Sequence, residues 1–163
     1  NVLGSRGSVL HLFRRAAREG RPLPLTDPRM TRFWLTQGQA VQFVLDSLER
    51  MRGAEVFIPR LPSLRVADLG AAVLGKAALE PGDYDLVGLR PGEKLHEMLV
   101  SPHEAARTVR QPGGFVVDPP ALFWRDRAPW ATVPLPEGFQ LTSDANPDWF
   151  TVGQMAQLLQ DVP

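Results

Sequence analysis

The chain contains no cysteine, which excludes disulfides, a thiol nucleophile and a thiolate metal site. Its 18 basic and 18 acidic residues balance, so no net charge attracts nucleic acid or an anionic membrane. No apolar run approaches the roughly 20 residues that span a bilayer, and the N-terminus lacks the layout of a signal peptide. We therefore expect a cytoplasmic protein that has neither a nucleic-acid nor a membrane partner.

Groups for redox and metal chemistry are also scarce. The only tyrosine, Tyr84, is followed four residues later by Gly88, so no Tyr-x-x-x-Lys pair is present for proton transfer beside a nicotinamide. A glycine-rich turn between a strand and a helix is missing as well. His11, His96 and His103 do not have metalloprotease spacing, and we expect no metal site. We expect no catalytic residue in this chain.

Arginine, by contrast, is abundant, because lysine accounts for only two of the 18 basic residues. Codon bias explains this preference more readily than phosphate binding does. The chain opens on Asn1-Val2-Leu3-Gly4 without an initiator methionine, which resembles the end of a strand entering a turn. We therefore expect it to be part of a longer protein, although removal of a leader or tag would also explain this start.

Apolar spacing predicts an α/β fold, because helices and strands alternate with short connections. We expect one domain over residues 1–163: mixed α/β over 1–100, an irregular proline-rich segment with short strands over 101–150, and a terminal helix over 151–161. The predicted helices cover 8–20, 36–53 and 66–75, and the strands 22–26, 31–35, 55–58, 84–89, 115–117 and 139–142. The second helix carries a stripe that we expect to be buried, formed by Ala40, Val41, Val44, Leu45, Leu48 and Met51.

The run Arg90-Pro91-Gly92-Glu93-Lys94-Leu95-His96-Glu97 is the most informative motif. The planar guanidinium of Arg90 suits diphosphate oxygens, and the carboxylate of Glu93 can accept hydrogen bonds from ribose hydroxyls. The Pro-Gly turn between them allows close backbone approach. Taken alone, the pattern also fits a solvated surface pair that opens a helix over residues 93–99.

Two other segments can hold an anion. Asn1 to Ser8 contains a Gly-Ser-Arg-Gly turn before a helix, where free backbone N–H groups can bind an anion, although a simple helix cap explains it too. In the run 27–34, Arg29 and Arg32 bracket a turn that enters an aromatic strand. One of them can reach a phosphate in a cleft, but taken alone the run favours two solvated arginines whose stems pack on the aromatic rings.

In this order and spacing, three motifs resemble the C-terminal half of UDP-N-acetylglucosamine 4,6-dehydratases, which are extended short-chain dehydrogenase/reductases. The motifs are Asn1-Val2-Leu3-Gly4-Ser5-Arg6-Gly7-Ser8-Val9, Asp27-Pro28-Arg29-Met30-Thr31-Arg32-Phe33-Trp34 and the run from Arg90 to Glu97. The likeness is greatest to the inverting members of pseudaminic acid biosynthesis and extends to Asn146-Pro147-Asp148-Trp149.

The resemblance implies a substrate-binding part that faces a Rossmann domain, with NADP bound mainly by that other domain. It implies that Asn1 lies near the sugar or its phosphates, that Arg32 and Arg90 contact the diphosphate, and that Glu93 holds the uridine ribose. Arg6 and Ser8 follow as further substrate contacts. The family oxidises sugar C4, eliminates water across C5 and C6 and returns the hydride to C6, and its members commonly form homo-oligomers.

Two alternative functions therefore remain. The chain is the UDP-sugar-binding half of a dehydratase, or it is a stand-alone binding or partner module without catalysis. A Tyr-x-x-x-Lys pair upstream in the same reading frame would exclude the second.

Overall fold

The computed structural model of the chain describes residues 1–119, 130 and 135–162. These residues form two compact units, each assembled from segments that are distant in the sequence. The first unit contains Asn1–Gln37, Pro62–Glu97 and Ser143–Pro163, and the second contains Gly38–Leu61 and Met98–Thr142. Sequence patterns are local, so they do not reveal that the chain returns repeatedly to the same unit.

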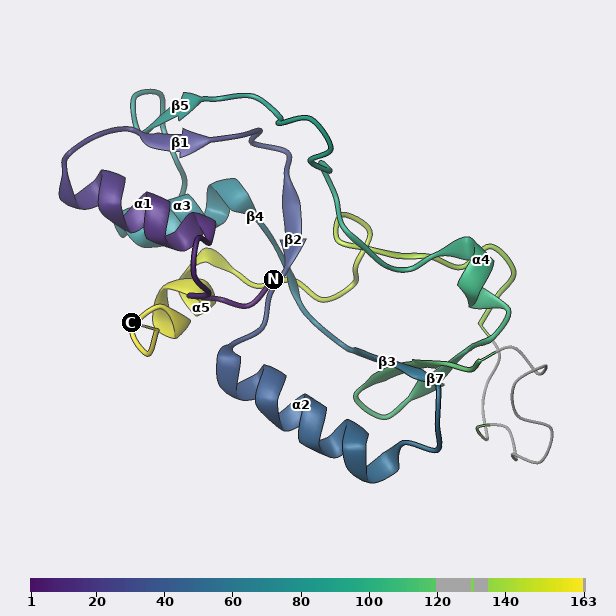
Figure 1. The fold of residues 1–163 in the computed structure, drawn as a ribbon. Helices are drawn as coiled ribbons and strands as arrows, with labels where there is room; N and C mark the ends of the chain where they lie inside the picture. Colours follow the sequence, from purple (N-terminus) through teal and green to yellow (C-terminus); the bar gives the residue numbers. More distant parts are fainter. Residues whose placement is uncertain (120–129, 131–134, 163) are drawn as a thin grey trace. The chain divides into compact units, whose positions relative to one another are not determined.

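The first unit consists of three helices and two small sheets (Figure 1). Its helices are α1 (Val9–Arg18), α3 (Val66–Leu74) and α5 (Val152–Leu158), and its strands are β1 (Leu23–Leu25), β2 (Thr31–Phe33), β4 (Ser63–Arg65) and β5 (Tyr84–Leu86). Strand β1 pairs in parallel with β5, and β2 pairs antiparallel with β4. An isolated parallel bridge joins Val2 to Leu35, so the first residues lie beside the end of β2.

The second unit is built around a three-stranded antiparallel sheet in the order β3-β8-β7. Its elements are α2 (Gln37–Arg50), β3 (Val56–Pro59), β6 (Met98–Val100), α4 (Pro102–Ala105), β7 (Thr108–Gln111), β8 (Gly114–Val117) and β9 (Leu141–Thr142). Strands β8 and β9 correspond to the short strands expected in the proline-rich segment. The expected irregular stretch around Pro120, Trp124, Pro129 and Pro134 lies outside the described residues.

Three helices of the first unit begin or end where the sequence predicts, because short local motifs determine these ends. Helix α1 is followed by Gly20 at φ +63°, and α3 ends at Gly75 at φ +68°, a conformation that glycine adopts without steric cost. Helix α5 begins with a capping box, in which Thr151 accepts a hydrogen bond from the backbone N–H of Gln154. These ends depend on only a few neighbouring residues, which explains why they could be predicted.

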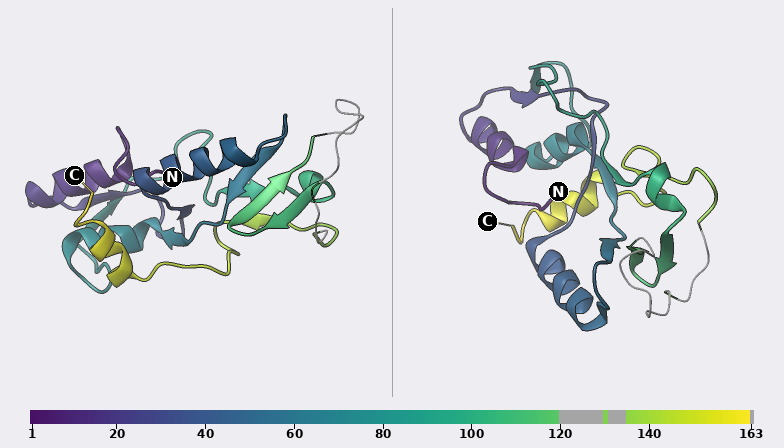
Figure 2. Two further views of the ribbon diagram at one scale, coloured as in Figure 1. Left: turned by 90° about the horizontal axis from the view of Figure 1, so that it is seen from below. Right: turned by 45° about the vertical axis from the view of Figure 1, so that its right-hand side comes forward.

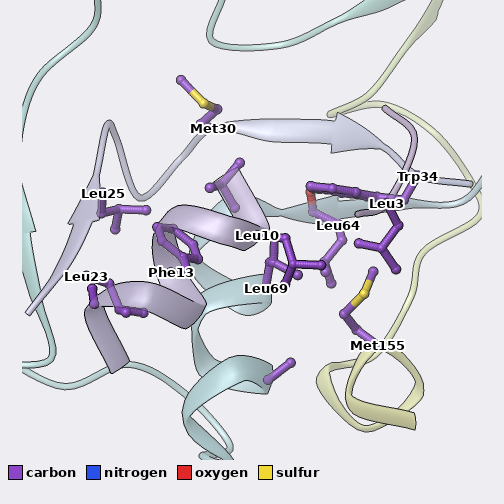
Figure 3. Packing of buried hydrophobic residues seen from close by; sticks show 13 residues of the cluster. Leu3, Leu10, Phe13, Leu23, Leu25, Met30, Trp34, Leu64, Leu69 and Met155 are labelled. Carbon is purple, nitrogen blue, oxygen red and sulfur yellow. Dashed lines mark hydrogen bonds between the residues drawn. The ribbon is translucent and has the colours of Figure 1, made fainter. Parts of the chain in front are cut away.

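The core of the first unit lies between α1, α3, α5 and the strands (Figures 2 and 3). Phe13 of α1 is fully buried near Leu23, while Leu3, Trp34 and Leu64 gather beside Met155 of α5 (Figure 3). Burial of side chains of this size contributes roughly 1.5 to 3 kcal/mol each. This core fixes α1 relative to β2, and both elements form walls of the site described below.

Gly70 lies inside α3 because the helix is closely packed there. A Cβ atom at this position would lie 3.0 Å from Leu23 Cδ1, 3.2 Å from Leu79 Cδ1 and 3.4 Å from Phe13 Cε2. The glycine therefore serves the packing of one helix against its neighbours. It does not form a phosphate-binding turn at a helix start.

The stripe on α2 that was expected to be buried is exposed. Val41, Val44, Leu45, Leu48 and Met51 have between 50 and 57% of their surface accessible, and α2 contains no buried residue in the described structure. The helix itself is confirmed, but periodicity reveals only that one face is apolar and not what covers it. Among the described residues, no helix combines the length and the apolar character needed to cross a bilayer.

The alternative helix over residues 93–99 is also not found. Residues 91–97 form turns and bends, and β6 follows at Met98. The backbone carbonyls of Lys94 and Leu95 accept hydrogen bonds from Arg32 and Thr31 instead of from later residues of a helix. Long-range hydrogen bonds thus override the local helical preference.

Candidate functional site

A cavity of about 500 Å³ opens in the first unit between the N-terminal turn, β2 and the loop after β5. It brings together all six residues that the sequence analysis assigned to substrate binding: Asn1, Arg6, Ser8, Arg32, Arg90 and Glu93. These residues come from three motifs that are widely separated in the sequence. Three guanidinium groups and one carboxylate line the same space, so its fixed charges favour an anionic ligand.

Strand β2 contributes one wall through alternate residues. Met30, Arg32 and Trp34 line the cavity, because successive side chains of a strand point to opposite faces. Val66 at the start of α3 adds a further apolar contact. The wall thus combines one cation with apolar and aromatic surface, as in pockets that hold a charged group beside a flat or apolar one.

The N-terminal turn and the start of α1 form a second wall. Ser8 is the N-cap residue of α1, but its side chain makes no capping hydrogen bond. Its Oγ is buried and has no hydrogen-bond partner among the described residues. The turn before it is held by a hydrogen bond from Ser8 N to Ser5 O of 3.0 Å, and His11 Nε2 lies 3.0 Å from Gly4 O. A fixed turn therefore places Ser8 and the N-terminus of α1 in the cavity wall.

Arg32 is buried, with 8% of its surface accessible, and most of its donors are already used. Nη1 donates to Thr31 O at 2.8 Å and to Leu95 O at 3.1 Å, and Nη2 donates to Lys94 O at 2.8 Å. Nε lies 3.6 Å from Glu97 Oε1. One hydrogen on Nη2 remains for a ligand, so Arg32 mainly fastens the segment at Lys94 and Leu95 to β2.

Arg90 and Glu93 lie on a tight turn at the rim. Glu93 N donates to Arg90 O at 3.0 Å, and Arg90 N donates to Glu93 Oε2 at 3.1 Å. The guanidinium of Arg90 and the second carboxylate oxygen of Glu93 have no partner among the described residues. Both groups are free to bind a ligand, and so is the exposed guanidinium of Arg6.

The turn at residues 27–30 separates the two arginines that bracket it. Arg29 is exposed and pairs with Asp27, with Nη2 to Oδ2 at 2.7 Å, which lowers the pKa of the Asp27 carboxyl to about 2. The reading of two solvated arginines is therefore correct for Arg29. It is wrong for Arg32, which the pairing of β2 with β4 places in the interior.

A second cavity, of about 460 Å³, opens beside the other face of β2. Its lining residues are Pro28, Arg29, Thr31, Arg65, His96, Asp144 and Trp149. Thr31 and His96 are joined by a hydrogen bond of 2.8 Å between Oγ1 and Nδ1. Neither residue was predicted from the sequence to have a role in binding.

Further residues of the first cavity were also missed. Thr26, Met30, Trp34, Val66 and Val87 line it, although none was assigned to binding. One of them was within reach of the sequence, because Trp34 lies two residues after Arg32 in the strand predicted over residues 31–35. Met30 lies two residues before Arg32, but the sequence placed it in the preceding turn. The other three come from elements whose spatial arrangement no local pattern reveals.

The described residues do not fit a nicotinamide dinucleotide or a metal ion. Gly70 is packed inside α3 and Gly75 ends it, so neither belongs to a glycine-rich turn at a helix start. No group of three or more metal-ligating side chains occurs in the described part of the chain. The cavity offers a surface with three guanidinium groups, from Arg6, Arg32 and Arg90.

Comparison with known families decides the relationship. Residues 1–119 match the family model described as polysaccharide biosynthesis protein. The chain belongs to this family. It is 35% identical, over 98% of its length, to the UDP-N-acetylglucosamine 4,6-dehydratase (inverting) of Campylobacter jejuni, of which it covers 48%. The resemblance found in the sequence is thereby confirmed.

Other similarities are consistent with this assignment. The chain is 36% identical to a UDP-glucose 4-epimerase of Rickettsia canadensis over 66% of its length, which covers 31% of that protein. The structure of Pen from Bacillus thuringiensis superposes with a TM-score of 0.79 at 26% identity, covering 99% of this chain and 46% of that one. The fold class is thus confirmed as part of a short-chain dehydrogenase/reductase fold. The chain spans about half the length of the curated dehydratases that it matches.

Proposed function

We propose that this chain forms the UDP-sugar-binding part of a nucleotide-sugar 4,6-dehydratase that acts on UDP-N-acetylglucosamine. The observation that carries the proposal is the single cavity in which Asn1, Arg6, Ser8, Arg32, Arg90 and Glu93 come together. The pathway would be surface polysaccharide or pseudaminic acid biosynthesis. This reading agrees with the names of the relatives, which include a dehydratase and an epimerase of UDP-sugars.

The state of each side chain supports a distinct role. Arg90 binds the diphosphate with its unpaired guanidinium, which can make two parallel charge-assisted hydrogen bonds to phosphate oxygens. Arg32 adds one donor from Nη2 while it holds the loop. Glu93 accepts from the ribose hydroxyls through the carboxylate oxygen that its own turn does not use.

Residues of the N-terminal wall provide further contacts to the ligand. Arg6 supplies a second unpaired cation, and the buried Oγ of Ser8 gains the hydrogen-bond partner that the protein does not provide. Asn1 lies on the same wall and contacts the sugar or its phosphates. The apolar surface of Met30 and Trp34 receives the non-ionic parts of the ligand.

The chemical steps would belong to groups outside these 163 residues. NADP would be held mainly by a Rossmann domain, because the residues present here do not fit it. This chain would contribute binding energy and orientation, and holding a substrate in the correct geometry can itself account for a large rate factor. The protein would be cytoplasmic and would form homo-oligomers, as the resemblance implies.

The exposed apolar stripe of α2 would pack against that Rossmann domain. Four apolar side chains on one face of α2, together with Met51 directly after the helix, are about half exposed. The dehydratase relatives are about twice as long as this chain. Contiguous apolar surface of this kind typically marks an interface. A second copy of the chain is the competing occupant, and the two are distinguished by whether the stripe is needed for association with the Rossmann domain or for self-association.

Isothermal titration with UDP and with UDP-N-acetylglucosamine tests the proposal. We expect Arg90→Ala and Glu93→Ala to weaken binding of both ligands. Arg18→Ala, at the C-terminal end of α1 and outside the cavity, is the matched control and should bind as the wild type does. Unchanged nucleotide affinity in both cavity variants would refute the assignment.

A further inference from the structure

Thr31, Ser143 and the half-buried His96 form a hydrogen-bonded network on the face of β2 that points away from the UDP-sugar cavity. Thr31 Oγ1 lies 2.8 Å from His96 Nδ1 and 2.6 Å from Ser143 Oγ. Thr31 is 3% exposed and Ser143 is fully buried. The three residues are separated by 65 and 112 positions in the sequence, so the network joins three distant segments of the first unit.

The available hydrogens determine the direction of each bond. Ser143 Oγ accepts from Glu97 N at 2.9 Å and lies 3.1 Å from Thr31 O, which can only accept, so the serine hydroxyl donates there. The Thr31 hydroxyl then donates its single hydrogen to Ser143 Oγ. His96 must therefore donate from Nδ1 to Thr31 Oγ1. This is the only arrangement in which all four contacts are hydrogen bonds.

The network holds the segment that carries Arg90 and Glu93. Thr31 N and Arg32 Nη1 both donate to Leu95 O, and Ser143 N donates to Glu97 O at 2.8 Å. Together with the bond from Arg32 to Lys94 O, each residue from 94 to 97 is attached to β2 or to Ser143. The turn at Arg90 is itself exposed, and this attachment lies directly after it in the chain.

We propose that Ser143, Thr31 and His96 are positioning residues that set the Arg90–Glu93 turn for the nucleotide. The inference rests on the proposed function, because it assumes that this turn binds UDP. None of the three lines the UDP-sugar cavity, and they act through the backbone of residues 94–97 and of Thr31. Their loss should therefore weaken UDP binding without removing any group that touches the ligand.

Titration of UDP into hydroxyl-deletion variants tests this. Ser143→Ala and Thr31→Val should each weaken binding by about fivefold or more, which is the effect of losing one hydrogen bond in an ordered site. Thr31→Ser keeps the hydroxyl and should retain the affinity of the wild type. Matched controls are Ser63→Ala and Thr108→Val, which remove buried hydroxyls bonded to Asn146 and to Glu104 O. These controls should bind UDP within about twofold of the wild type, although they should lower the melting temperature about as much as Ser143→Ala and Thr31→Val do.

Substitution of His96 tests the deduced direction of its bond. His96→Asn keeps an N–H donor near the position of Nδ1 and should retain most of the affinity, while His96→Leu should weaken UDP binding as Thr31→Val does. Equal losses in both variants would overturn the assignment of His96 as the donor.

The outcomes separate this inference from the function on which it rests. If Arg90→Ala weakens binding but Ser143→Ala and Thr31→Val bind UDP as the wild type does, the positioning role is wrong and the proposed function stands. Losses of the same size in Ser63→Ala and Thr108→Val would also overturn it, because the effect would then follow general stability. If Arg90→Ala binds UDP unchanged, both proposals fall.

Discussion

Replacement of Arg32 by lysine should lower stability, whereas replacement of Arg90 by lysine should not. The guanidinium of Arg32 donates three hydrogen bonds to the carbonyls of Thr31, Lys94 and Leu95 in a nearly inaccessible site. A lysine ammonium keeps the charge but cannot reproduce the planar fork, so about two of these bonds are lost. Each hydrogen bond to a charged group contributes roughly 1.5 to 3 kcal/mol, and partial rearrangement of the site recovers some of this. We therefore expect the free energy of unfolding to fall by about 2 to 4 kcal/mol.

Thermal unfolding followed by calorimetry measures this difference. For a protein of this size the loss corresponds to a decrease of about 10 °C in melting temperature. Arg90→Lys is the matched variant, because Arg90 is exposed and unpaired among the described residues. The melting temperature of this variant should stay within about 2 °C of that of the wild type. Arg32→Lys with the melting temperature of the wild type would refute the view that Arg32 fastens residues 94 and 95 to β2.

Two further predictions concern α2 and the turn at Asp27. Val44→Glu should leave the stability of this chain unchanged, since Val44 is 55% exposed, but it should abolish association with a separately produced Rossmann domain, as measured by gel filtration. Glu49→Gln on the same helix is the control. Association that survives Val44→Glu would contradict the proposal. The Asp27 carboxyl has its pKa lowered from 3.8 to about 2 by Arg29, so its contribution to stability is present above pH 3.8 and is lost as the pH falls through about 2. Arg29→Gln should flatten the pH dependence of the free energy of unfolding in that window, and curves that stay parallel to the wild type would exclude this cause.

Some elements could be predicted because their causes are local. The ends of α1, α3 and α5 follow from a glycine after the helix or from a capping box before it, as at Gly75 and Thr151. The exposure of the apolar stripe on α2 could not be predicted, because an apolar stripe does not specify its partner. The segment at Lys94 and Leu95 was open to a helical reading for a related reason: its carbonyls accept hydrogen bonds from residues more than 60 positions away.

Part of the lining of the candidate cavity could be predicted from the sequence. Three motifs in register pointed to Asn1, Arg32, Arg90 and Glu93, and these residues line one cavity. What the motifs did not reveal is the division of labour between the arginines, in which Arg32 is bonded to the backbone and Arg90 is unpaired. That difference depends on which carbonyls lie within reach of each guanidinium, and only the folded chain determines it.

The dissociation constant of UDP for the wild type and for Arg90→Ala tests the central claim most directly. A charge-assisted contact to the diphosphate is worth roughly 1.5 to 3 kcal/mol, so the variant should bind about ten to 150 times more weakly than the wild type. The melting temperatures of the two proteins should agree, because Arg90 is exposed. Equal dissociation constants would contradict the proposal that this cavity holds a UDP-sugar.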